Sequence, residues 1–290
     1  MCRRRATTRR GDAPAPPFSY AMSVLSPAHF MPLLHADDPP PVERCNEQGH
    51  APVLLTCDHA SAAVPRALDG LGLSAGAIGE HIGWDIGAAA VTRLLAAALD
   101  APALLSGYSR LVVDCNRDPG DPTSIPAESD GIAVPGNGDL SPEASVQRLE
   151  ACFAPYHTAI AARLDAFEAE GIVPAFLSIH SFTPVMEGVA RPWHVGILWD
   201  KDPRISEPLL AALSADSSIA VGDNQPYSAR EPTGFTVGYH AIARGLPHVA
   251  LELRQDLIAA EEGAAAWAAR LAAALRPILA RREIYRVERY

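Results

Sequence analysis

The chain of 290 residues contains no long apolar run. A membrane-spanning helix needs about 18 or more predominantly apolar residues in succession, and no segment approaches that length. Residues 1–10 are rich in arginine, but serine, proline and histidine interrupt the apolar residues of 20–34 that follow. Such a pattern is a poor secretory or twin-arginine signal. We expect instead a disordered tail, or a true start at Met22 or Met31.

Cysteine is scarce, and its spacing excludes two of its common uses. Five cysteines are present, an odd number, and no Cys-x-x-Cys pair occurs. Neither a disulfide framework nor a thiol-redox motif is therefore indicated. Cys57 and Cys115 lie in apparent strands, where a reduced cysteine packs as a small apolar side chain. Reduced cysteines are typical of the cytoplasm, and we expect the protein to be cytoplasmic.

Positive charge is in deficit as well. Lysine and arginine number 24 against 34 aspartates and glutamates, which gives a formal net charge of −10. Nucleic acid requires a basic face, so it is excluded as the main partner, although a few focused arginines can still bind a small anion. Apolar residues make up 48% of the chain, as in an ordinary globular protein. The expected partner is a small molecule, with neither nucleic acid nor a membrane involved.

The order of apolar segments predicts an α/β fold. Short apolar runs typical of buried strands alternate with longer segments of helical periodicity. Strands are predicted at 52–57, 103–105, 111–113, 175–179, 195–198, 219–221 and 249–253, and helices at 86–99, 141–170, 208–213, 239–245 and 264–280. This alternation implies a mainly parallel or mixed central sheet with helices on both faces. Residues 1–48 are predicted to be a disordered tail, and 49–290 a single α/β domain.

Polar residues follow four of the predicted strands. His59 follows the first strand, residues 114–117 follow another, His180 follows a third, and Glu252 lies towards the end of the last. In open α/β sheets, sites form outside the carboxyl ends of the strands. A single histidine in such a place is more often a hydrogen-bonded structural residue. Four polar strand ends together favour a functional site.

Two histidines and one carboxylate are the usual set that holds a catalytic zinc with a fourth position open for water. His59 and His180 supply the nitrogens. The carboxylate stays open between two residues, because no His-x-x-Glu follows His59. Asp85 is preferred, since it lies in a Gly-flanked turn before a helix, where it would otherwise be a helix N-cap. Asp58 is the alternative ligand, unless it orients His59 from behind.

Five strings in this order resemble the N-formylglutamate amidohydrolase family. They are TCDHAS at 56–61 with Val64-Pro65, GWDIGA at 83–88, SRLVVDCNR at 109–117, HSF at 180–182 and ELRQDL at 252–257. They span residues 52–258, which together with the closing helix is most of the chain beyond the tail. The strings SIHSF and VDCNR are also distantly similar to zinc carboxypeptidases, although His-x-x-Glu is missing here. This similarity implies a zinc-carboxypeptidase-like fold of the phosphorylase/hydrolase-like kind.

The resemblance implies metal-dependent hydrolysis of N-formyl-L-glutamate or a related N-acylamino acid, as in histidine degradation. The products would be the free amino acid and formate or another carboxylic acid, and the metal would be Zn²⁺ or another divalent ion. Glu252 would be the general base, and Arg110 would stabilise the oxyanion or bind a second carboxylate. Asn116 and Arg117 would bind a substrate carboxylate. Arg254 would be either a further substrate contact or a surface ion pair.

Two other classes of function stay open. A cysteine hydrolase would use Cys57 or Cys115 with a nearby histidine, although apolar strands disfavour a thiolate. A non-catalytic or differently specific protein that binds acidic small molecules would keep the arginines. Glu252 argues against that second alternative, because binding alone requires no base. Neither the acyl group, nor the amino acid accepted, nor the oligomeric state has a readable signal in the loops 118–139 and 182–192.

Overall fold

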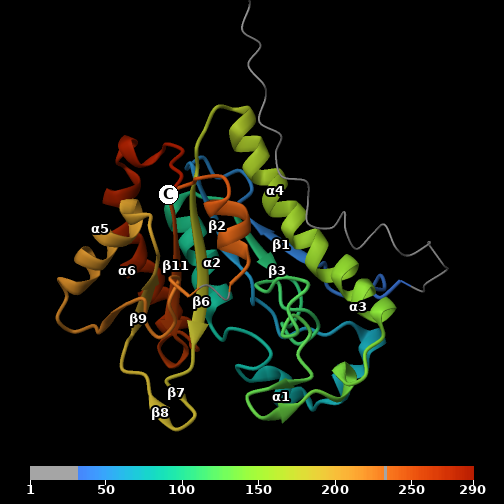
Figure 1. Ribbon diagram of the computed structural model, residues 1–290. Helices are drawn as coiled ribbons and strands as arrows, with labels where there is room; N and C mark the ends of the chain where they lie inside the picture. Colours follow the sequence, from blue (N-terminus) through green and yellow to red (C-terminus); the bar gives the residue numbers. More distant parts are fainter. Residues whose placement is uncertain (1–31, 232–233) are drawn as a thin grey trace, which may run out of the picture. The chain divides into compact units, whose positions relative to one another are not determined.

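A computed structural model of the protein describes residues 32–231 and 234–290, and a seven-stranded mixed sheet lies at their centre (Figure 1). The strand order is β1-β3-β2-β6-β11-β9-β10. The strands are β1 Val42–Cys45, β2 Val53–Cys57, β3 Ala103–Ser106, β6 Ala175–Phe182, β9 Val195–Leu198, β10 Val221–Asp223 and β11 His248–Arg254. The central strands β3, β2, β6 and β11 run parallel, whereas β1 and β9 pair antiparallel with β3 and β11. The predicted α/β class with a mainly parallel or mixed sheet is confirmed.

Helices cover both faces of this sheet. The α-helices are α1 Ala75–Gly79, α2 Ala88–Leu99, α3 Pro142–Arg148, α4 Ala154–Ala169, α5 Pro203–Ser214 and α6 Glu261–Leu279. The π-helical turns are η4 Leu149–Phe153, which joins α3 to α4, and η5 Val237–Ile242. Helices α2, α5 and α6 pack on one face and α4 lies across the other (Figure 1). Within the described ranges, no helix is both long and apolar enough to cross a membrane.

The two faces of the central strands differ in chemistry, although both are buried. Leu55, Ile179 and Leu251 pack into the apolar core with α2, α5 and α6. Because side chains alternate along a strand, the neighbouring Ser178 and Glu252 lie on the opposite face, towards α4. A polar layer is thus built into one side of an otherwise apolar sheet.

One predicted strand, 111–113, is absent from the structure. These residues are buried, but they form turns, and a local backbone bond together with side chains, not a neighbouring strand, satisfies their backbone groups. Asn137 Nδ2 donates to the carbonyl of Leu111 at 2.8 Å, and Arg148 Nη1 donates to that of Val112 at 3.2 Å. An apolar run therefore signals burial here and not pairing in a sheet.

The predicted tail, residues 1–48, includes residues that belong to the folded domain. Residues 42–45 form β1, whose backbone pairs with β3 along its whole length, so the folded part begins before residue 49. Residues 1–31 of the predicted tail lie outside the described residues. Two short hairpins also escaped prediction: β4 Glu128–Ser129 with β5 Ile132–Ala133, and β7 Val185–Met186 with β8 Val189–Ala190.

A buried histidine–aspartate group as the candidate active site

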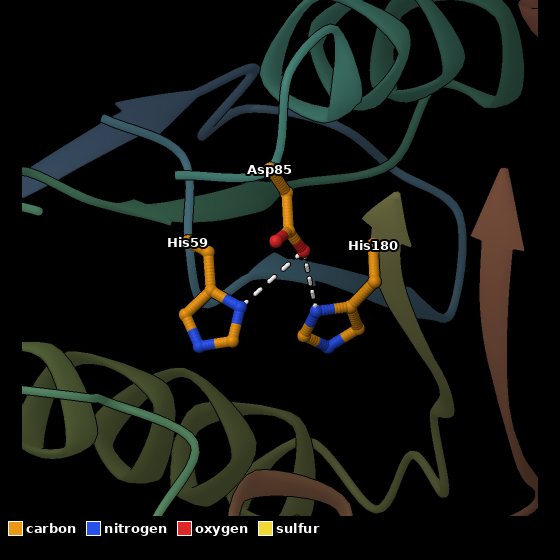
Figure 2. A group of neighbouring side chains, drawn as sticks. All are labelled: His59, Asp85 and His180. Carbon is orange, nitrogen blue, oxygen red and sulfur yellow. Dashed lines mark hydrogen bonds and ion pairs between the residues drawn. The ribbon is translucent and has the colours of Figure 1, made fainter. Parts of the chain in front are cut away.

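His59, Asp85 and His180 come together at the carboxyl end of the sheet (Figure 2). Their ligand atoms all lie within 4.8 Å of one another. Oδ2 of Asp85 is 3.3 Å from Nδ1 of His59 and 2.9 Å from Nδ1 of His180. All three side chains are buried, with at most 6% of the residue exposed. The three residues predicted as metal ligands therefore face one common point.

The backbone around Asp85 aims its carboxylate at the histidines. Its N–H donates to the carbonyl of His59 at 2.9 Å, which ties the turn before α2 to the end of β2. The N-cap of α2 is Gly87, in the left-handed region at φ 82°, and no side chain caps this helix. A Cβ at Gly87 would overlap the carbonyl oxygen of Ile258, so the turn requires glycine. Asp85 is consequently not the helix cap that its sequence position also allowed.

Each histidine has a buried carboxylate behind it. Nε2 of His59 donates to Oδ1 of Asp114 at 2.6 Å, and Nε2 of His180 lies 3.1 Å from Oδ2 of Asp58. Metal-ligating histidines almost always donate their second N–H to such a partner, which fixes the ring and its tautomer. Both rings thus present Nδ1 to Asp85 and Nε2 to an orienting carboxylate.

Asp58 lies behind His180 and is not part of the converging group. It is fully buried, and its oxygens accept hydrogen bonds from Tyr156 Oη at 2.8 Å and Thr236 Oγ1 at 2.9 Å. As a rival ligand it is therefore poorly placed. The expectation that it would orient His59 is wrong as well, because Asp114 supports that ring and Asp58 supports the other.

The local charges favour a cation between the two rings. Burial alone would lower the pKa of His180, yet its hydrogen bonds to Asp58 and Asp85 raise that pKa well above the ordinary value. Burial likewise opposes charge on His59, but Asp114 and Asp85 raise its pKa overall. The carboxylates that stabilise a proton there would stabilise a divalent ion in the same way. The donor set of two nitrogens and one carboxylate fits zinc.

Glu252 lies beside this group on the neighbouring strand. It pairs in register with His180 across β6 and β11 and with Gly196 across β9. The residue is 7% exposed, and its Oε2 atom is buried without a hydrogen-bond partner in the described part of the chain. Burial raises the pKa of Glu252 to about 7, with Asp85 adding to the rise and His180 opposing it. A carboxyl with that pKa exchanges a proton near neutral pH.

Arg110, the first arginine of the 109–117 string, is paired with Asp114 and Asp85. Arg110 Nη2 donates to Oδ2 of Asp114 at 2.9 Å, and Nη1 lies 3.5 Å from Oδ1 of Asp85. About a quarter of its side chain is exposed, with a relative accessibility of 26%. The guanidinium is thus fixed next to the His59–Asp85–His180 group and still reaches the surface.

Asn116 and Arg117 follow this arginine in a turn, not at a strand end. Oδ1 of Asn116 accepts hydrogen bonds from the backbone N–H groups of Phe235 at 2.8 Å and Thr236 at 3.0 Å. Asn116 therefore anchors the segment that leads into η5. Arg117 Nη1 donates to the carbonyl of Asn116 at 3.2 Å. Whether either residue binds substrate stays a prediction.

Arg254 is ion-paired within its own turn. Its Nε and Nη2 atoms donate to the two carboxylate oxygens of Asp256 at 2.8 and 3.2 Å. This geometry favours the ion-pair role that the sequence also allowed for Arg254. The cysteine alternative finds less support, because burial raises the pKa of Cys57 and Cys115 well above the usual thiol range. A thiolate is disfavoured at both positions.

Comparison with known proteins agrees with the fold and the motifs. The family model of N-formylglutamate amidohydrolase matches residues 51–259. The crystal structure of a gene product from Agrobacterium tumefaciens is 36% identical, with a TM-score of 0.82, and the match covers 85% of this chain and 98% of that one. N-formylglutamate amidohydrolase from Ralstonia eutropha JMP134 is 16% identical, with a TM-score of 0.55 over 82% of this chain and 97% of that one, a likeness of fold. None of the curated proteins matches the chain.

Proposed function

Because the chain belongs to the N-formylglutamate amidohydrolase family and is an amidohydrolase, we propose that it hydrolyses N-formyl-L-glutamate or a related N-acylamino acid with a bound divalent metal. The products are the free amino acid and formate or another carboxylic acid. A cytoplasmic location and a place in histidine degradation stay predictions from the sequence.

One observation carries the metal dependence. Two histidines turn Nδ1 towards Asp85 while buried carboxylates hold their Nε2 atoms, an arrangement that orients both rings for a shared ion. His59, Asp85 and His180 would hold zinc or another divalent ion. When bound, such an ion would polarise the amide carbonyl and lower the pKa of water to about 7.

We assign the proton transfers to Glu252. Its unpartnered Oε2 and its pKa of about 7 suit a base that takes a proton from the attacking water and passes it to the leaving nitrogen. Arg110, fixed by Asp114, would stabilise the negative oxygen that develops on the former carbonyl. Asn116 and Arg117 would bind a substrate carboxylate next to it.

A substrate screen with a chelator control tests this proposal. The full chain, loaded with zinc, is assayed on the N-formyl, N-acetyl and N-succinyl derivatives of L-glutamate. We expect hydrolysis of at least the N-formyl compound and loss of it after chelation, with recovery when zinc is restored. Equal turnover before and after complete removal of divalent ions would refute the metal dependence. No turnover of any N-acylamino acid would refute the proposed reaction.

A further inference from the structure

Arg191 lies one residue beyond β8 and has an unusual set of partners. Its Nη1 atom donates to Oγ1 of Thr183 and to Oη of Tyr227, both at 3.2 Å. The centre of its guanidinium is 5.1 Å from the ring centroid of Tyr227 and 6.0 Å from that of Phe182. Across residues 32–231 and 234–290, no carboxylate pairs with this cation. Two hydroxyls and two aromatic rings hold this cation, and none of the described carboxylates lies within ion-pair distance of it.

Two other arginines, by contrast, are paired with carboxylates. Arg254, which follows Glu252 on β11, has both carboxylate oxygens of Asp256 as acceptors. Arg110 is paired with Asp114 and Asp85. The guanidinium of Arg191 instead retains donors that a bound carboxylate can accept from in a fork.

The β7–β8 hairpin brings Arg191 to the candidate active site. In Figure 1 this hairpin extends beyond the carboxyl end of β6. Phe182, on which Arg191 packs, comes two residues after His180 on the same strand. The two side chains therefore lie on one face of the sheet, about 7 Å apart along the strand.

The loop after β10 brings Tyr227 in from the other side. A Cβ at Gly196 would overlap the carbonyl oxygen of Gln225, so this loop passes directly over Gly196. Gly196 in turn pairs with Glu252. Tyr227 is 44% exposed. Desolvation of its phenol raises the pKa, the negative charge of Glu252 raises it further and the Arg191 cation lowers it, so the ring lies within electrostatic reach of Glu252.

We propose that Arg191, positioned by Thr183 and Tyr227, binds the side-chain carboxylate of the substrate and so selects N-acyl derivatives of acidic amino acids. This inference rests on the proposed function. A dicarboxylic substrate needs two cationic partners, and Arg110 is already paired with two carboxylates of the protein. Arg117 would then bind one substrate carboxylate and Arg191 the other.

The test compares two substrates that differ only in side-chain charge. Wild type and Arg191→Met, both zinc-loaded, are assayed on N-formyl-L-glutamate and on N-formyl-L-glutamine, whose amide has the same shape without the charge. We expect kcat/KM of the variant to fall by about 10- to 100-fold on the glutamate derivative, the range for a hydrogen bond to a charged group. Turnover of the glutamine derivative should change by less than about threefold.

Two further variants distinguish recognition from structural support. Tyr227→Phe keeps the ring under Arg191 but removes its hydroxyl, so it should reduce the preference for glutamate by a smaller factor. Arg270→Met is the matched control, because Arg270 also packs on an aromatic ring, that of Trp267 on α6 at 5.2 Å. The control should leave both activities unchanged.

A binding measurement keeps the inference separate from the proposed reaction. Calorimetric titration with the products L-glutamate and L-glutamine requires no turnover, and Arg191→Met should weaken only the binding of L-glutamate. Equal losses for the two ligands in Arg191→Met would overturn the role of Arg191 even if the wild type is active. A wild type that hydrolyses no N-acylamino acid, but binds L-glutamate through Arg191, would overturn the proposed function and support the inference.

Discussion

Replacing Glu252 with glutamine should strongly reduce activity and yet stabilise the metal-free protein at alkaline pH. The burial of this carboxyl raises its pKa from the ordinary 4.5 to about 7. Below pH 4.5 it is protonated in both the folded and the unfolded chain, so it has no effect on stability. Between pH 4.5 and 7 the unfolded chain releases the proton and the folded one retains it, so wild-type stability falls as pH rises. The loss amounts to about 3 kcal/mol above pH 7.

Glutamine has no charge to bury, so Glu252→Gln escapes this loss. In urea unfolding with a chelator present, its advantage over wild type should grow by about 2–3 kcal/mol between pH 5 and pH 8. The zinc-loaded variant should keep its metal content while kcat falls by about 10²-fold or more, the usual contribution of a positioned base. Glu207→Gln, an exposed glutamate on α5, is the matched control and should show neither effect. A stability difference that does not vary with pH would show that Glu252 is not held protonated by burial, and near-normal kcat would show that it is not the base.

Three further substitutions test other residues of the candidate active site and of the turn that carries Asp85. Asp114→Asn should lower the affinity for zinc by about 10- to 100-fold in a competition assay, because it supports the His59 ring, and unchanged affinity would contradict that role. Arg117→Lys keeps the charge and loses the planar fork, so it should raise KM for an acidic substrate; unaltered kinetics would make Arg117 structural. Gly87→Ala should lower the free energy of unfolding by more than about 1 kcal/mol, since φ 82° and the carbonyl of Ile258 leave no room for a Cβ; an unchanged Tm would show that the turn can shift.

The parts of the site that follow strands could be predicted from the sequence. His180 and Glu252 follow apolar runs, and the strands β6 and β11 place them side by side. The three metal-binding candidates are the predicted ones. The hydrophobic pattern was sufficient to predict these positions, because the carboxyl ends of parallel strands meet at one edge of the sheet, where sites form.

The supporting contacts could not be predicted in the same way. Asp58 is adjacent to His59 in sequence but supports His180, because alternation along the chain turns neighbouring side chains to different partners. Asp114 reaches His59 from a buried turn that resembles a strand in composition. Arg191 and Tyr227 meet through two loops whose lengths and composition specify no contact. Such pairs depend on how distant segments pack, which neither the periodicity nor the spacing of residues in one sequence specifies.

Metal dependence is tested by a zinc titration of the chelated protein, with N-formyl-L-glutamate hydrolysis and bound metal measured in the same samples. His180→Ala is titrated in parallel. We expect activity to rise in proportion to bound zinc and to reach its plateau at one ion per chain, whereas the variant should neither retain the ion nor gain activity. Full activity at zero bound metal, or a His180→Ala protein that binds zinc as tightly as wild type, would contradict this expectation.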